Sequence, residues 1–394
     1  MQIGIIGKAN CGKSTFFKAC TLANIEISNR PFVTIKPNVG TSYVTVECAD
    51  KEFNVQCNPR FGYCIDHIRF VPFDLIDVAG LIPGSHEGKG LGLAFLNDLN
   101  QADVLIHVID CSGSTNEKGE PVSPGTHDPT KDILFIEYEL DMWFFSIIKK
   151  GWEKFARTVQ QEKQDIIKAL TKQLSGLKIT EDVIKNIIKE FHMNPMTWDN
   201  KDLFKLASQL RRKTKPMIIA ANKIDIPESQ SNLERLKKEF PQYTIITCSG
   251  DSELALREAS KAGLIEYIPG SKDFRIIKDL TPQQNKALDF IKENVLNKFG
   301  STGIQEILNK AVFDLLKCIA VFPGGVNKLS DSEGRVLPDC YILPPNSTAL
   351  DFAFKLHTDL GKNFIRAINV KTKQIIGREY LLKHRDVIEI VTKK

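Results

Sequence analysis

Six short apolar runs rich in β-branched residues recur over the first two thirds of the chain. Several of them are continuously apolar instead of alternating with polar residues, which is typical of strands covered on both faces by helices. We therefore predict an α/β domain with a doubly wound, mostly parallel sheet. The predicted strands lie within residues 3–6, 43–46, 70–78, 104–109, 217–221 and 244–247.

The periodicity becomes helical between the fourth and fifth of these strands. Asp128-Pro129 looks like a cap followed by proline, and the next apolar residues fall on one helical face. Further helices are predicted at 153–174, 181–191 and 199–212. We interpret this stretch as an antiparallel helical insertion. Its many Lys, Gln and Glu residues form either a solvated face or a partner-binding surface.

A third pattern marks the end of the chain. A helical stretch at 282–316 leads into short strand-like runs around one helix-like segment, 350–360, which predicts a small α+β domain. The runs are 318–322, 341–343, 367–370 and 387–391. The predicted division is residues 1–126 plus 215–316 for the α/β domain, 127–214 for the helical insertion and 317–394 for the C-terminal domain.

Composition agrees with several folded cores. The chain has 394 residues, of which 42% are hydrophobic and 26% charged, a balance typical of globular proteins. The opening MQIGIIGKANCGKS is too short and too quickly broken by glycine and lysine to be a signal peptide or a membrane span, so we expect a cytoplasmic protein. The net charge of +5 permits contact with a polyanion without requiring it.

The nine cysteines are scattered, and their odd number does not suggest a secreted disulfide framework, so we expect reduced thiols. One group, Cys48, Cys57, Cys64 and His67, raises the question of a metal site. Only Cys64 and His67 have the short separation common between zinc ligands. A packed or partly exposed hairpin is the favoured interpretation, and a metal site is the alternative.

The strongest motif is G-x-x-x-x-G-K-S at residues 7–14, directly after a predicted strand and before a predicted helix. In such a P-loop the backbone amides surround the β-phosphate, Lys13 reaches the β- and γ-phosphates and the Ser14 hydroxyl ligates Mg²⁺. The predicted phosphate-binding residues are Lys8, Ala9, Asn10, Cys11, Gly12, Lys13, Ser14 and Thr15.

Two further elements fit a triphosphate with magnesium. Asp77-Val78-Ala79-Gly80 ends a predicted strand, where Asp77 can hold Mg²⁺ through water and the Gly80 amide can contact the γ-phosphate. Thr34 lies between this element and the P-loop and is a candidate second hydroxyl ligand. Singly, each is a common feature of loops. The predicted metal ligands are Ser14, Thr34 and Asp77.

The sequence Asn222-Lys223-Ile224-Asp225 follows a predicted strand, at the sheet edge where ligands of such folds bind. The Asp225 carboxylate suits the N1–H and exocyclic amine of guanine, whereas adenine has an acceptor at N1 and would leave it unpaired. Ser249-Gly250 follows the next strand and could supply an amide to the base oxygen. The predicted nucleotide is therefore GTP.

With these motifs in place, the chain resembles the translation-factor-related GTPases, specifically the YchF branch of the Obg-like group. Its P-loop begins almost at the first residue, a helical insertion separates D-x-x-G from N-K-x-D, and the tail resembles a TGS domain. The TGS resemblance rests on residues 350–353, 356–357, 364–367 and 386–390 and implies a ubiquitin-like β-grasp fold. Bacterial and eukaryotic members favour ATP with an altered N-K-x-D, so Lys223 and Asp225 support GTP here, and dual use stays open.

The position that holds a water-orienting glutamine in Ras-like switches is Leu81, which has no hydrogen-bonding group. We therefore expect slow turnover supported by Lys13, Thr34, Gly80 and Asn10. In related potassium-dependent GTPases the position of Asn10 helps to hold K⁺, and a loop-shaping role is the alternative. His86, in a glycine-rich stretch, is either a catalytic group or a solvated loop residue.

The resemblance implies contact with the ribosome or RNA through the TGS and helical domains. From residue 325 onward there are twelve Lys and Arg against eight Asp and Glu, a modest surplus that could meet phosphates. Two functions are therefore compared. The first is a GTP-hydrolysing switch at the ribosome, favoured by Lys13, Ser14, Thr34 and Asp77. The second is a nucleotide-gated binding module with incidental hydrolysis, which Leu81 favours slightly.

Overall fold

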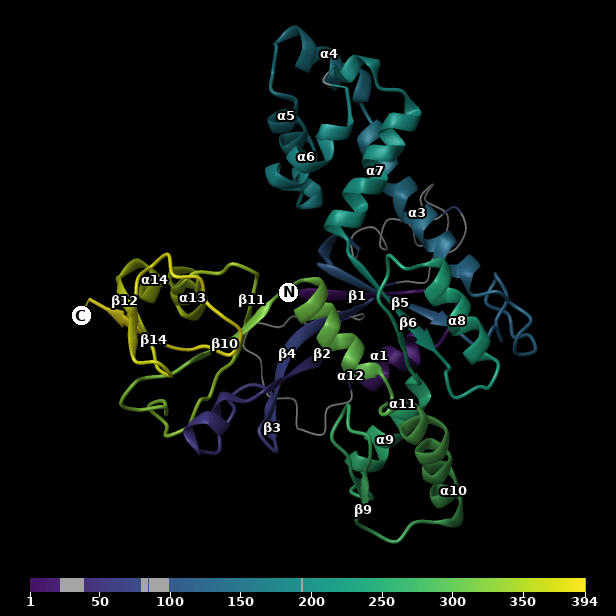
Figure 1. Cartoon of the computed structure of the whole chain (residues 1–394), viewed down its shortest axis with the longest axis vertical. Helices are drawn as coiled ribbons and strands as arrows, with labels where there is room; N and C mark the ends of the chain where they lie inside the picture. Colours follow the sequence, from purple (N-terminus) through teal and green to yellow (C-terminus); the bar gives the residue numbers. More distant parts are fainter. Residues whose placement is uncertain (22–38, 79–83, 85–98, 193, 394) are drawn as a thin grey trace. The chain divides into compact units, whose positions relative to one another are not determined.

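A computed structural model describes residues 1–21, 39–78, 84, 99–192 and 194–393. The chain divides into two compact units (Figure 1). Unit 1 comprises Met1–Phe17 and Ile76–Asp251, and unit 2 comprises Lys18–Leu75 and Ser252–Lys394. The three-domain division expected from the sequence stays a prediction.

Unit 1 contains a parallel sheet whose strands follow the order β1-β5-β6-β7. These are β1 (Gln2–Ile6), β5 (Val104–Asp110), β6 (Met217–Asn222) and β7 (Ile245–Thr247). Every residue of β5 and β6 is buried, as expected for strands made mainly of apolar residues. The parallel, doubly wound class is confirmed, and the carboxyl ends of all four strands meet at one edge.

The helices of unit 1 include the predicted insertion. They are α3 (Thr130–Lys149), α4 (Trp152–Gln161), α5 (Ile166–Gln173), α6 (Glu181–Ile187), α7 (Asn200–Thr214) and α8 (Ser229–Glu239), with 3₁₀ turns at Ser175–Leu177, Ile188–Glu190 and Pro195–Thr197. The two long helices α3 and α7 pack together, and a buried ion pair of 2.7 Å joins Arg211 Nε to Asp141 Oδ1.

The single helix predicted at 153–174 is wrong. The chain leaves the helix after Gln161, and the Asp165 side chain accepts hydrogen bonds from the amides of Ile167 and Lys168, which starts α5. Aspartate is a favourable N-cap residue, so it specifies a new helix start at this point.

The N-terminal part of unit 2 is built around a hairpin. Helix α1 (Lys13–Thr21) begins in unit 1, and β2 (Val39–Glu47), a 3₁₀ turn (Ala49–Phe53), β3 (Tyr63–Ile65) and β4 (Ile68–Asp77) follow. β3 and β4 pair antiparallel. The two turn residues, Asp66 and His67, have φ values of 49° and 61°, so both are left-handed. Such a turn matches the twist of a two-residue hairpin.

The middle part of unit 2 is largely helical. It contains α9 (Gly250–Lys261), β8 (Ile265–Glu266), β9 (Arg275–Ile276), α10 (Pro282–Ile291), α11 (Asn297–Phe299) and α12 (Ile304–Asn309), with π-helical turns at Lys292–Leu296 and Lys310–Leu315. The helical stretch predicted at 282–316 is confirmed, and it divides where Gly300 and Gly303, with φ of 78° and 79°, interrupt the helices.

The C-terminal part of unit 2 forms a mixed five-stranded sheet in the order β11-β10-β14-β12-β13 (yellow in Figure 1). Its elements are β10 (Ile319–Pro323), β11 (Tyr341–Leu343), α13 (Ala349–Leu356), α14 (Thr358–Lys362), β12 (Phe364–Asn369), β13 (Gln374–Ile376) and β14 (Val387–Thr392). Phe352 of α13 packs into a core with Val321, Ala367 and Ile388. The predicted α+β domain is confirmed, and β13 was missed.

Within the described ranges, no helix combines the length and the apolar character that crossing a membrane requires.

Candidate nucleotide-binding site

The P-loop joins the end of β1 to the start of α1 in unit 1. Phe16 N donates to Gly12 O at 2.9 Å, which closes the first turn of the helix. Gly12 has φ of 94°, and a Cβ there would lie 2.1 Å from Asn222 Nδ2. Only glycine fits this position without displacing its neighbour.

Two P-loop side chains, Lys8 and Asn10, form hydrogen bonds to the segment that follows β5. Lys8 is buried, and its ammonium donates to Thr115 O at 2.8 Å and pairs with Asp132 Oδ2 at 2.8 Å. Asn10 Nδ2 donates to Gly119 O at 2.9 Å. Lys8 therefore offers a phosphate its backbone amide, not its charge.

Cys11 of the P-loop is a buried thiol. It is fully buried, and its Sγ donates to Lys8 O at 3.1 Å. Burial raises the pKa of the Cys11 thiol to about 11, so the thiol stays neutral and acts as a packing group.

The ammonium of Lys13 forms an ion pair with Asp77 Oδ1. Val78 N donates to Ile5 O at 3.1 Å, which holds Asp77 and Val78 beside the end of β1. The predicted phosphate ligand and the predicted magnesium ligand thus lie side by side, and Ser14 follows Lys13 in the first turn of α1. A hydroxyl and a carboxylate are hard oxygen donors, the type that Mg²⁺ prefers, so these residues fit the ion.

Asn222 connects the phosphate-binding and base-recognition segments. It ends β6, is 2% exposed, and donates from Nδ2 to Cys11 O at 3.0 Å. Its Oδ1 accepts from Gly250 N at 2.9 Å. Both halves of one amide are used, so the P-loop, the end of β6 and the start of α9 are held in one arrangement.

Lys223 is anchored by a residue that the sequence analysis did not select. Its ammonium lies 2.9 Å from Asp110 Oδ2 and 3.1 Å from Ser114 Oγ. Burial raises the pKa of Asp110, but hydrogen bonds from Lys223, Ser112 and Thr115 outweigh it and hold the pKa below its usual range. A polar residue at the end of an otherwise apolar strand was the available signal.

The side chain of Asp225 has no partner among the described residues. Asp225 is partly exposed, and within the described residues its carboxylate accepts no hydrogen bond. Of the other predicted base contacts, Ser249 is buried and the Gly250 amide is taken by Asn222. The amide that meets the base oxygen would then come from another residue of that turn.

Four residues of the sequence predictions lie outside the described residues: Thr34, Gly80, Leu81 and His86. The described site consequently comprises the P-loop, Asp77 and the two loops that follow β6 and β7.

Three protein-family models match successive parts of the chain. Residues 2–138 match a family described as 50S ribosome-binding GTPase, residues 220–325 match the G4 motif-containing domain of the YGR210-like Obg-like GTPases, and residues 332–392 match the TGS domain.

Relatives that align over the whole chain are also named as GTP-binding or ribosome-binding proteins. An uncharacterized GTP-binding protein of Methanocaldococcus jannaschii is 51% identical over 99% of both chains. The ribosome-binding ATPase YchF of Mycoplasma genitalium is 31% identical over 98% of both chains. The crystal structure of a GTP-binding protein from Pyrococcus horikoshii aligns over 100% of both chains with a TM-score of 0.79 and 38% identity.

The parallel sheet, the P-loop and the N-K-x-D loop define a nucleotide-binding protein of the P-loop NTPase class. Within that class the family matches follow one another along the chain, from the GTPase segment to the TGS domain. The chain belongs to the Obg-like GTPase family, in its YchF branch.

Proposed function

We propose that this protein binds GTP with Mg²⁺ and hydrolyses it slowly as a molecular switch. The observation that carries the proposal is the placement of Asp225. The residue follows a strand end that Asn222 ties to the P-loop, and its carboxylate is not satisfied within the described structure. A partly buried carboxylate at that point selects a base with two adjacent donors, which guanine has and adenine lacks.

The experiment compares GTP, ATP and XTP binding to the wild type and to Asp225→Asn. We expect the wild type to prefer GTP over ATP by about 1000-fold or more, because a site built for paired bonds rejects a base without them. An asparagine amide can donate to the xanthine O2, so the variant should lose GTP and gain XTP. Glu228→Gln removes a nearby exposed carboxylate and is the matched control.

Comparable ATP and GTP affinities in the wild type would instead indicate dual specificity. Relatives named as ATPases make that outcome a real alternative. An unchanged base preference in Asp225→Asn would remove the proposed role of this residue.

Magnesium would be held by Ser14, Asp77 and Thr34, and it would neutralise charge on the β- and γ-phosphates. Lys13 exchanges its ion pair with Asp77 for the phosphates when the nucleotide binds. This exchange keeps the ammonium next to negative charge in both states. The catalytic contribution of Lys13 and of the Gly80 amide is electrostatic stabilisation of the developing charge.

We also propose that Asn10 helps to bind a potassium ion. Its Nδ2 is used by Gly119, whereas its Oδ1 accepts no hydrogen bond from the described residues and is available to a cation. Turnover should then be faster in KCl than in NaCl. Equal rates would leave Asn10 with the loop-shaping contact alone.

A link to ribosomes is supported by the 50S ribosome-binding GTPase family match and by relatives named ribosome-binding, and it implies a cytoplasmic site of action. Adding purified ribosomes to a GTP turnover assay should raise the rate. Binding to ribosomes without any stimulation would favour the nucleotide-gated binding module over the hydrolysing switch.

A further inference from the structure

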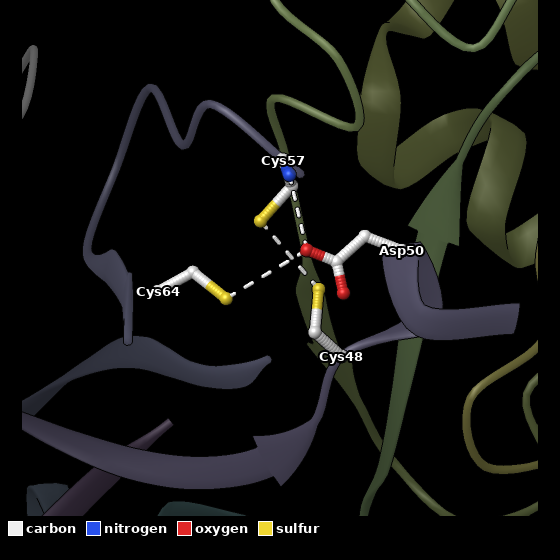
Figure 2. A group of neighbouring side chains, drawn as sticks. All are labelled: Cys48, Asp50, Cys57 and Cys64. Atoms are coloured by element: carbon white, nitrogen blue, oxygen red, sulfur yellow. Dashed lines mark hydrogen bonds between the residues drawn. The ribbon is translucent and has the colours of Figure 1, made fainter. Parts of the chain in front are cut away.

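Three cysteines and a buried aspartate converge in unit 2, and none of them belongs to the nucleotide-binding site. Cys48 follows β2, Asp50 lies in the adjoining 3₁₀ turn, Cys57 lies in the next loop and Cys64 lies in β3 (Figure 2). One sulfur from each cysteine and one carboxylate oxygen all lie within 4.8 Å of one another. Three segments of the chain, around residues 48–50, 57 and 64, thus present ligand atoms to one point.

The spacing of these atoms fits a single tetrahedral ion. Zinc–sulfur bonds of about 2.3 Å place two sulfurs about 3.8 Å apart at the tetrahedral angle. Cys48 Sγ and Cys57 Sγ are 3.6 Å apart. Cys64 Sγ lies 3.9 Å from Asp50 Oδ2, against about 3.5 Å for a sulfur and an oxygen on one zinc ion. These two distances differ from the tetrahedral values by about 0.4 Å or less, and the other ligand atoms lie within 4.8 Å.

The carboxylate of Asp50 is already held by hydrogen bonds. The Asp50 side chain is fully buried, and its Oδ1 is 2.9 Å from His67 Nδ1. Its Oδ2 accepts from Cys57 N at 3.0 Å and faces the sulfurs. A histidine that holds one oxygen while the other faces the cluster is the arrangement expected of an outer ligand that orients a metal-binding carboxylate.

A buried cation complements the cluster. Arg69 is fully buried and donates from Nη1 to Leu337 O at 3.0 Å and from Nη2 to Pro338 O at 2.8 Å. Its Nη1 also lies 3.5 Å from Cys57 Sγ, and across the described ranges no carboxylate oxygen is within ion-pair distance of it. A buried guanidinium requires negative charge nearby, and thiolate ligands would supply it.

We propose that Cys48, Asp50, Cys57 and Cys64 bind one structural Zn²⁺, with His67 and Arg69 as outer partners. Three thiolates and one carboxylate around a divalent ion leave a net charge of about −2, which the buried guanidinium of Arg69 partly offsets. Thiolates select zinc over magnesium or calcium. An iron–sulfur cluster is a poorer fit, because its ligands are divided over two or more irons and must surround the whole cluster, whereas these atoms converge on one point.

A disulfide explains the arrangement less well. It would require two sulfurs at about 2.05 Å, and it would give no role to the third cysteine or to the Asp50 oxygen that faces the sulfurs. The cysteines here are free.

The ion would fix a part of unit 2 that has little regular structure. The loop after Asn54 carries Cys57 and also Asn58 and Arg60, whose amides donate to Val336 O at 2.9 Å and Pro338 O at 2.8 Å. Together with Arg69, these bonds hold the segment that precedes β11. Zinc at the cysteines therefore stabilises the approach to the C-terminal sheet and has no direct role in hydrolysis.

The test begins with the wild-type full-length chain purified without chelator in Mg²⁺ buffer. Elemental mass spectrometry should find one zinc per chain, and replacement by Co²⁺ should give the visible bands of a tetrahedral thiolate-bound ion. Alkylation should modify Cys48, Cys57 and Cys64 only after a strong chelator is added. Absence of zinc together with free alkylation or with a Cys48–Cys57 disulfide would overturn the proposal.

Variants then assign the ligands. Cys57→Ser should lose the bound zinc, whereas Cys318→Ser, a cysteine outside the cluster, should retain it. His67→Gln keeps all four ligands and should bind zinc about 10- to 100-fold more weakly. If Cys57→Ser does not fold, the alkylation pattern and the Co²⁺ spectrum of the wild type still decide. Full zinc content in Cys57→Ser would refute the ligand assignment.

Discussion

The histidine in the middle of β5 makes unit 1 sensitive to acid. His107 is fully buried, and neither ring nitrogen has a hydrogen-bond partner among the described residues. Burial lowers the pKa of His107 to about 3, against a usual value of 6.5. The folded state therefore holds the ring neutral, whereas the unfolded chain takes up a proton below about pH 6.5.

The sign and size of the effect follow from these two values. The stability contributed by the neutral ring is complete above about pH 6.5 and decreases as the pH falls toward 3. Between pH 7.5 and pH 5 the loss is about 2 kcal/mol, since each pH unit below 6.5 costs about 1.4 kcal/mol. His107→Leu should abolish this loss. At pH 7.5 the variant should be at least as stable as the wild type, because two unpaired polar atoms are removed from the core.

The assay uses the three tryptophans, Trp143, Trp152 and Trp198, which all belong to unit 1. Urea unfolding followed by their fluorescence at pH 7.5 and pH 5 reports the stability of the unit that contains β5. His192→Gln changes an exposed histidine of the same unit and controls for general loss of imidazole. If His107→Leu lost as much stability on acidification as the wild type, the reasoning about the buried ring would be refuted.

Two further predictions concern the nucleotide site. Gly12→Ala places a methyl group 2.1 Å from Asn222 Nδ2 at a backbone φ of 94°. The resulting strain of about 1–3 kcal/mol should reduce GTP affinity about 10- to 100-fold. The control is Gly176→Ala, which has open space around it and should bind GTP with normal affinity. Asp110→Asn removes the buried charged partner of Lys223. It should lower the unfolding free energy of unit 1 by about 3 kcal/mol in the tryptophan assay. An unchanged urea midpoint would contradict this expectation.

The motifs were predictable because each is contained in a short stretch of sequence. The P-loop and the N-K-x-D segment have fixed spacings, and the burial of β5 and β6 follows from their mainly apolar residues. Lys13 and Asp77 were both selected, although their pairing depends on the register between two strands far apart in the chain.

The network beneath the site was not predictable in the same way. Asp110 and Gly119 act through contacts that form only when the loop after β5 folds back toward the P-loop and β6. Neither position has a recognisable motif. The helix end at Gln161 was missed because the apolar periodicity continues across the break, and the local cap at Asp165 overrides periodicity.

The cysteine cluster shows the limit of spacing arguments most clearly. The intervals between Cys48, Cys57 and Cys64 match no common zinc pattern, so the sequence alone favoured a simple hairpin. The left-handed turn at Asp66 and His67 brings Cys64 back toward Cys48, and Asp50 joins from a 3₁₀ turn. An aspartate ligand was not among the sequence candidates.

The central claim is that the carboxylate of Asp225 recognises guanine by hydrogen bonds while the P-loop binds the phosphates. Calorimetric competition between GDP and ADP on the wild-type protein, at fixed Mg²⁺, measures this base selectivity without any contribution from the γ-phosphate or from hydrolysis. The account predicts that excess ADP fails to displace GDP, with affinities separated by about 1000-fold. Displacement of GDP at similar ADP concentrations would contradict it.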